Sequence, residues 1–145
     1  MRYVLIAAVI AWIAFDVGRG ALTGLANARQ EELSSMPLPK MLEVVAGSEE
    51  RRVGSEWVDN AMLDRISADR RTIVYHLTMT RKTKHQIDAN WSKGWRSSIR
   101  HQLTRKTCNS RLLGLSLSRG ARVAYQCADK DGRPAFRFEV SRSKC

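Results

Sequence analysis

The sequence predicts an α+β fold: an N-terminal membrane-anchor helix, followed by a small ββαββ domain with a four-stranded antiparallel sheet packed on one main helix. Three features lead to this prediction. They are an apolar run close to the N-terminus, two pairs of strand-like segments, and a long helical pattern between those pairs. The chain accordingly divides into an anchor over 1–28, a tether over 29–55 and a basic α+β domain over 56–145.

Length and composition fit one globular domain with a surplus of positive charge. The 145 residues match the size of a single domain, for which about 100–200 residues is typical. Hydrophobic residues make up 43% and charged residues 27%, which is typical of a folded chain and argues against disorder. The net charge of +11 favours anionic partners such as nucleic acid, anionic lipid or an acidic protein surface.

The apolar run over 3–15 follows the basic residue Arg2 and is shorter than the roughly 20 residues of a full membrane span. Asp16 and Arg19 interrupt the pattern, but their spacing lets them pair on one face of a helix. A helix that continues to about Ala28 would span a membrane if it were tilted, and Arg2 favours an N-terminus on the inside. We therefore expect a single-pass protein of a bacterial inner membrane with its C-terminal domain in the periplasm.

Two alternatives stay open for this N-terminal segment. Ala26-Asn27-Ala28 has the small-x-small form that signal peptidase cleaves, although it lies farther beyond the apolar run than a cleavage site usually does. The run could also be a buried helix of a soluble protein.

Residues 29–55 have the composition of a tether. Pro37 and Pro39 stiffen and extend the chain, whereas the glycine- and charge-rich stretch 47–54 loosens it. We expect only part of 41–46 to pack on the domain.

Two strands are predicted next, over Val58–Ser67 and Thr72–Thr80, with a turn at 69–71 between them. The second strand has the strict alternation of apolar residues that is typical of a half-buried strand. Its apolar face consists of Ile73, Tyr75, Leu77 and Met79.

A helix is predicted from Asp88, as its N-cap, to about Lys106, where the cationic side chain suits the negative end of the helix dipole. Apolar residues recur at every fourth position on one side of this helix, which is typical of packing against a sheet. These residues are Trp91, Trp95, Ile99 and Leu103. A second short helix is predicted over Ser110–Leu117.

The chain closes with a predicted hairpin. Arg122–Ala128 and Arg133–Arg142 alternate as strands do, and the Asp-Lys-Asp-Gly sequence of 129–132 is a turn signal. The order strand, strand, helix, strand, strand then predicts a four-stranded antiparallel sheet with the helix across one face.

The three cysteines are Cys108, Cys127 and Cys145. If the hairpin turns at 130–131, the position opposite Cys145 is near Ser116, which is too far along the strand from Cys127 at about 3.3 Å per residue. The preferred bridge is therefore Cys108–Cys145, with Cys127 as a buried thiol. Such a bridge forms in an oxidising compartment, and the alternative is three reduced thiols in a cytosolic protein.

No catalytic or metal-binding constellation is recognisable. His76, His85, His101 and the cysteines have no zinc-type spacing. Because Cys108 lies seven residues after His101, no base stands beside this thiol along the helix. The glycines form no phosphate-binding loop. We therefore expect no enzyme activity, no cofactor, no metal and no small-molecule substrate.

The best functional candidate is the basic segment Arg81–Lys106, in which Asp88 is the only acidic residue. Lys93, Arg96 and Arg100 lie off the apolar stripe, where they could contact phosphates, lipid headgroups or an acidic partner. The alternative is that these charges only solvate the outer face of the helix.

Residues 72–145 also form a pattern. It comprises Thr72-Ile-Val-Tyr-His-Leu77, a helix that ends at Cys108, Gly120-Ala-Arg-Val-Ala-Tyr125, the Asp131-Gly132 turn and the terminal Cys145. This pattern resembles small anchored periplasmic proteins of proteobacteria and their prophages. In plan it is similar to the inner-membrane superinfection-exclusion proteins of lambdoid phages, which have one anchor and a small outer domain. Cys127 stands where an aromatic residue is more usual in this pattern.

Three functions stay open. The leading hypothesis is a non-enzymatic, membrane-tethered binding module that contacts an envelope protein or incoming DNA in the periplasm, as a superinfection- or entry-exclusion factor would. The first alternative is an accessory subunit of a cell-envelope or secretion complex. The second is a cytosolic nucleic-acid-binding protein, which requires reduced thiols and a soluble N-terminal helix.

Overall fold

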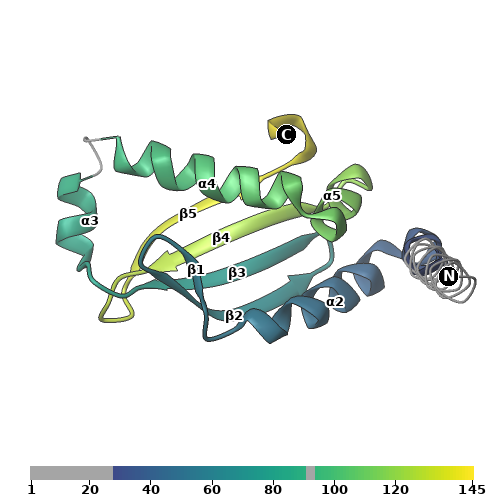
Figure 1. Ribbon diagram of the computed structural model, residues 1–145, viewed down its shortest axis with the longest axis horizontal. Coiled ribbons are helices and arrows are strands. Elements are labelled where there is room, and N and C mark those ends of the chain that lie inside the picture. Colours follow the sequence, from purple (N-terminus) through teal and green to yellow (C-terminus); the bar gives the residue numbers. More distant parts are fainter. Residues whose placement is uncertain (1–27, 91–93) are drawn as a thin grey trace, which may run out of the picture. The chain divides into compact units, whose positions relative to one another are not determined.

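The structure is a computed structural model that describes residues 28–90 and 94–145 (Figure 1). The chain divides into two units, Met1–Met36 and Pro37–Cys145. In the first unit, residues 28–35 form a helix. The predicted anchor lies outside the described residues except for Ala28. Within the described ranges, no helix has the length and apolar character needed to cross a membrane.

Five strands form one sheet in the second unit. They are β1 (Glu56–Val58), β2 (Ala61–Asp69), β3 (Thr72–Met79), β4 (Arg122–Ala128) and β5 (Pro134–Val140). The strands lie side by side in chain order, and each neighbouring pair is antiparallel except β3 and β4, which are parallel. The α+β class is confirmed, but the predicted sheet of four antiparallel strands is wrong in both strand number and direction.

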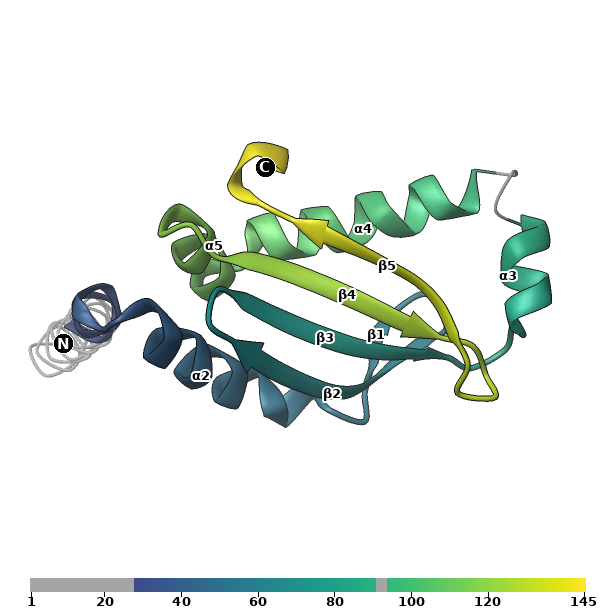
Figure 2. The same ribbon diagram turned by 180° about the vertical axis from the view of Figure 1, so that it is seen from behind.

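The parallel pair results from the helices that connect β3 to β4. These helices are α3 (Lys84–Asn90), α4 (Trp95–Asn109) and α5 (Arg111–Ser118). Figure 2 shows them carrying the chain from the end of β3 back past its start, so β4 begins beside the start of β3. A crossover of this length is what parallel neighbours require. The helical connection between the two strand pairs is therefore the reason why β4 runs parallel to β3.

The additional strand arises at the predicted start of the first one. Val58 ends β1, and the chain turns through Asn60, whose φ of 59° lies in the left-handed region that asparagine tolerates. β2 begins directly afterwards and pairs with β1. What the sequence predicts as one strand is therefore a short strand, a tight turn and a longer strand.

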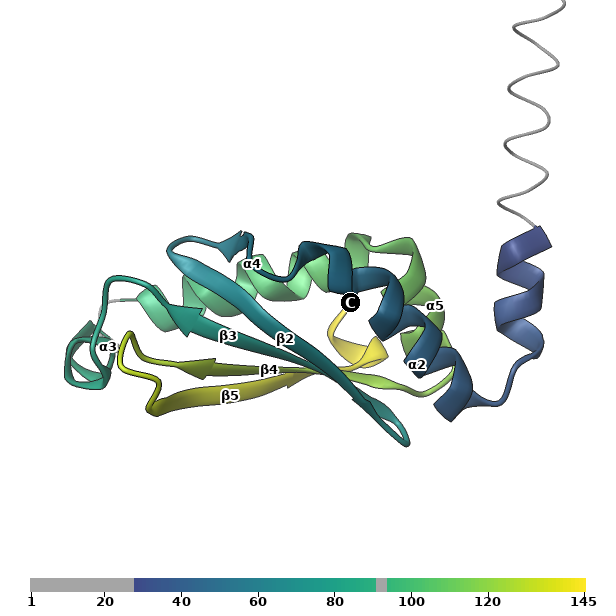
Figure 3. The ribbon, with the colours of Figure 1, turned by 90° about the horizontal axis from the view of Figure 1, so that it is seen from below.

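The helices α2 (Leu38–Glu49), α4 and α5 cover one face of the sheet, which we call the helix-covered face (Figure 3). Within the described residues of the second unit, no α-helix lies on the other face, which we call the open face. Each strand directs apolar residues into the helix layer, and β1 contributes Trp57. Burial alternates strictly along β3. The predicted inward residues of β3 are all buried: Ile73, Tyr75, Leu77 and Met79.

Helix α2 lies within the segment predicted as a tether. Pro37 is its N-cap residue and Pro39 lies in its first turn. Backbone N–H groups of a first turn have no partner within the helix, so a proline there costs no hydrogen bond, and its fixed φ suits the helix. Met41, Leu42 and Val45 are buried on its inner side. The tether interpretation is thus wrong for Leu38–Glu49, because these prolines begin a helix and the apolar residues that follow belong to the core.

The predicted helix from Asp88 is interrupted. Gly94 has a φ of 76°, a conformation that costs glycine little, and it precedes the first residue of α4. Asp88 lies inside α3 and is not an N-cap. Ile99 and Leu103 are buried as predicted, and the buried stripe continues to Thr107. Trp91 and Lys93 lie outside the described residues.

The last hairpin follows the prediction closely. β4 has the predicted bounds. The short helix predicted before it is α5, and Ser110 caps this helix by accepting a hydrogen bond from the backbone N–H of Leu113. Cys127 lies opposite Phe136 and not opposite Pro134, because the pairing shifts beside Ala128. The shift does not change the cysteine pairing.

A disulfide joins Cys108 at the end of α4 to Cys145, with 5.6 Å between the Cα atoms. Cys127 is a buried free thiol. The bridge is the one preferred from the sequence, and it ties the chain end after β5 to the helix layer. Lys144 adds a hydrogen bond of 2.6 Å from its Nζ to the carbonyl oxygen of Glu139.

Candidate docking groove

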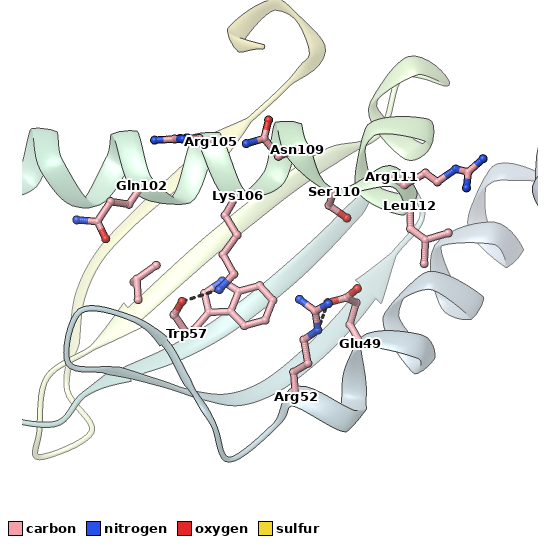
Figure 4. A pocket seen from close by; sticks show the side chains of 11 residues that line it. Glu49, Arg52, Trp57, Gln102, Arg105, Lys106, Asn109, Ser110, Arg111 and Leu112 are labelled. Atoms are coloured by element: carbon pink, nitrogen blue, oxygen red, sulfur yellow. Dashed lines mark hydrogen bonds and ion pairs between the residues drawn. The ribbon is translucent and has the colours of Figure 1, made fainter. Parts of the chain in front are cut away.

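A groove of about 760 Å³ lies between the end of α2, strand β1 and the C-terminal half of α4 (Figure 4). The 3-10 helix η1 (Glu50–Arg52) and the first turn of α5 complete its walls. Its lining residues are Glu49, Arg52, Trp57, Val58, Gln102, Arg105, Lys106, Asn109, Ser110, Arg111 and Leu112. All of them belong to the second unit.

Trp57 supplies the aromatic floor of this groove. Its ring lies 5.1 Å from that of Tyr75, and the residue is only 4% exposed. Tyr75 lies 5.2 Å from Tyr125, which lies 5.3 Å from Phe138. These rings form one row across the helix-covered face, from β1 to β5. Core packing therefore holds the floor of the groove in place.

Lys106 lies directly on this floor. It extends from α4, donates a hydrogen bond of 2.7 Å from Nζ to the carbonyl oxygen of Trp57, and holds Nζ 4.0 Å from the centre of the indole ring (Figure 4). Such a position over an aromatic face is favourable for a cation. Burial, and then the nearby charge of Arg52, lower the pKa of Lys106. The ammonium group is therefore partly desolvated and faces a second positive charge.

Arg52 and Glu49 approach Trp57 from the opposite wall. The guanidinium carbon of Arg52 lies 5.6 Å from the centre of the indole ring, and its Nε lies 3.5 Å from a carboxylate oxygen of Glu49. Glu49 itself is buried. The one acidic residue of the lining is thus already paired within the wall of the groove.

The charge of the groove is strongly one-sided. Four basic residues line it against the single acidic one; they are Arg52, Arg105, Lys106 and Arg111. The surrounding sequence has the same character, since no Asp or Glu occurs from 89 to 128, a stretch that includes all of α4 and α5. An anionic group that enters the groove would meet a net positive surface.

Arg96 and Arg100, the described residues of the predicted contact surface, do not line this groove. Arg96 and Arg100 are exposed on α4, and the guanidinium carbon of Arg100 lies 5.6 Å from the ring centre of Phe138. Lys93 lies outside the described residues. A contact role for Lys93, Arg96 and Arg100 therefore stays a prediction, separate from the groove.

The sequence does not identify Arg52, Trp57 and Lys106 as site residues, because they come from three elements that lie far apart in the chain. The tether interpretation includes Arg52, and the helical pattern places Lys106 only at a helix end. The i,i+3 spacing of Glu49 and Arg52 is the one local signal of their pairing. Their position around one indole ring depends on how α2 and α4 pack over β1.

A second hollow of about 290 Å³ lies on the open face, over β2, β3 and β4. His76 lines it, with its Nε2 atom 3.1 Å from the hydroxyl oxygen of Ser67. Burial, and then the charge of Arg65, lower the pKa of His76. Asp64 lines the hollow beside Arg65, so this site carries both charge signs and favours neither anions nor cations.

Nucleophile and metal chemistry find little support in the described residues. Burial raises the pKa of the Cys127 thiol to about 12, so the thiol is protonated at neutral pH. Across 28–90 and 94–145, no three His, Cys, Asp or Glu side chains are grouped so as to hold a metal ion.

No protein-family model matches the sequence, and no curated protein is similar to it at a significant level. Three solved structures share its fold. A protein of Pseudomonas aeruginosa assigned as secreted has 21% identity and a TM-score of 0.61, over 74% of this chain and 92% of that one.

The other two are pilotins of type II secretion systems. The pilotin EpsS of Vibrio vulnificus has 17% identity and a TM-score of 0.59, over 74% of this chain and 91% of its own. The pilotin AspS of Vibrio cholerae has 16% identity and a TM-score of 0.58, over 83% of this chain and 99% of its own. At these identities the similarity shows a common fold.

Proposed function

We propose that this chain is a non-enzymatic accessory subunit of a cell-envelope or secretion complex, and that it binds a protein of that complex in the groove over Trp57. The observation that carries this proposal is the groove itself: a rigid aromatic floor with cationic walls, built on a fold shared with two secretion-system pilotins. A binding site of this kind needs no catalytic group.

An envelope location is part of the proposal. The Cys108–Cys145 bridge supports it, because disulfides persist in oxidising compartments such as the periplasm. Attachment to the inner membrane through 1–28 rests on the sequence pattern alone. Periplasmic and cytoplasmic reporters fused after Gln30 and at the C-terminus would test both parts. Cytoplasmic activity at the C-terminus would contradict the location.

Co-purification of the full-length protein from its native host tests the function. We expect one envelope protein in stoichiometric amount, which is lost when Arg105→Glu or Lys106→Glu reverses a charge of the groove. Arg70→Glu, at the exposed turn between β2 and β3, is the matched control and should retain the partner. The absence of a stoichiometric partner, or its equal loss in all three variants, would contradict the proposal.

The exclusion hypothesis stays a second proposal and makes a different prediction. None of the three similar structures is described as an exclusion protein, and a role in blocking phage or DNA entry rests on the resemblance of 72–145. Expression in a sensitive host, followed by challenge with phages and conjugating donors, separates the two. Broad loss of susceptibility without a co-purifying complex would favour exclusion.

A further inference from the structure

We propose that the groove selects an acidic segment of its protein partner, and that one carboxylate of this segment binds between Lys106 and Arg52 above the Trp57 ring. This inference rests on the proposed function in one respect, namely that the partner is a protein. It adds the chemistry by which the partner is recognised and the residues that recognise it.

The two cations lie close enough together that, besides burial, the charge of Arg52 lowers the pKa of Lys106. Both lie over the same indole ring, with Lys106 Nζ 4.0 Å and the Arg52 guanidinium carbon 5.6 Å from its centre, and they come from opposite walls (Figure 4). Neighbouring like charges repel, and the ring face relieves only part of that repulsion. A carboxylate between them accepts hydrogen bonds from both and removes the repulsion.

Lys106 has donor capacity for this contact. An ammonium group has three N–H donors, and the bond to the carbonyl oxygen of Trp57 takes one of them. Lys106 is half-buried, so part of the desolvation of its ammonium group has already occurred in the unbound protein. Binding an anion there therefore costs less additional desolvation than at an exposed lysine.

Glu49 does not substitute for the partner's carboxylate. It is buried behind Arg52 with an N–O separation of 3.5 Å, and this pairing orients the guanidinium toward the ring. The wall opposite carries Arg105 and no acidic residue. The groove thus retains a net positive charge after its internal pair has formed.

The shape of the groove favours a short segment of a protein. Its volume of about 760 Å³ is of the size that encloses a few side chains, and the half-buried Val58 and Leu112 add apolar surface beside the charges. A flat membrane surface would contact the exposed rim of α4, where it could not reach the indole floor. The matching ligand is a segment with acidic and apolar side chains close together.

The test uses the full-length protein in a neutral detergent and a fluorescein-labelled amphipathic peptide in three versions, with Glu, Gln or Lys at the polar positions. Fluorescence anisotropy reports binding. We expect the Gln version to bind about tenfold more weakly than the Glu version and the Lys version to bind more weakly still.

Variants then assign the selectivity to the groove. Lys106→Gln and Arg52→Gln should each weaken binding of the Glu peptide by about tenfold and leave the Gln peptide unchanged. Arg70→Gln removes the same charge from an exposed turn and should change binding by less than about twofold. Circular dichroism confirms folding, and Arg105→Gln, at an exposed position, repeats the test without touching Trp57.

Three outcomes would overturn this inference. The Gln peptide could bind as tightly as the Glu peptide, the Arg70→Gln control could match the groove variants, or phosphatidylglycerol vesicles could displace the Glu peptide and lose affinity in the same variants. The last result would identify an anionic lipid surface as the ligand. If the peptide selectivity holds but no stoichiometric partner co-purifies, the proposed function fails and the acidic site stands.

Discussion

Tyr125 and Gln126 are neighbours on β4, and their side chains lie on opposite faces of the same sheet. Tyr125 is fully buried on the helix-covered face, where its hydroxyl lies 2.6 Å from that of Thr107 on α4. Gln126 lies on the open face beside His76 and Arg137, its partners on the neighbouring strands. One face holds the rings that fix the fold and the groove, whereas the other is polar and half-buried.

This difference shows where stability and recognition reside. The aromatic row on the helix-covered face ends at Trp57, so the packing that stabilises the domain also supports the floor of the groove. The open face has charges of both signs; Glu139 pairs with Arg122 and Arg137 at 3.5 and 3.3 Å. Charges that are exposed and mixed in sign contribute little to stability and attract no particular ligand.

Truncation of the two neighbouring side chains should give the largest difference between the faces. Tyr125→Ala removes a buried ring and leaves the hydroxyl of Thr107 without this partner, so we expect the free energy of unfolding to fall by about 3–5 kcal/mol. Gln126→Ala should change it by about 0.5 kcal/mol or less. Urea denaturation measures both, and similar losses would contradict the division between the faces.

Removal of the disulfide should have the next largest effect, because the bridge ties the end of β5 to the helix layer. With a sequence separation of 37, the double variant Cys108→Ser/Cys145→Ser should lose about 3–4 kcal/mol, since the unfolded chain regains the entropy of an open loop. Reductant should destabilise the natural protein by a similar amount and leave the double variant unchanged. An equal response of both proteins to reductant would contradict this assignment.

The pH response of the open face should be the smallest effect. The pKa of His76 is lowered in the folded protein, whereas the unfolded chain binds the proton with an ordinary pKa near 6.5. The contribution of His76 to stability is therefore present above about pH 6.5 and is lost as the pH falls below it. Thermal melts of the natural protein and of His76→Asn between pH 5 and 8 would converge toward acid pH. Parallel curves would show that His76 has no such role.

Local pattern was sufficient for much of the fold. The alternation along Thr72–Met79 places its buried residues correctly, and along Arg122–Ala128 it identifies Val123, Tyr125 and Cys127, since a strand must direct every second side chain to the same face. Ser110 and the apolar residues after it predict α5 in the same way. Two features depended on the connection between elements. The strand direction of β4 follows from the crossover, and the break at Gly94 is not visible in a stripe of apolar residues that continues across it.

The groove was beyond the reach of local pattern. The sequence by itself determined the α+β class, the basic character of α4 and the pairing of Cys108 with Cys145, because periodicity, charge and turn position are local properties. Only the tertiary structure decided that Arg52, Trp57 and Lys106 meet. Their contact depends on α2 and α4 packing over the short strand β1, and residues about 50 positions apart carry no local signal of that approach.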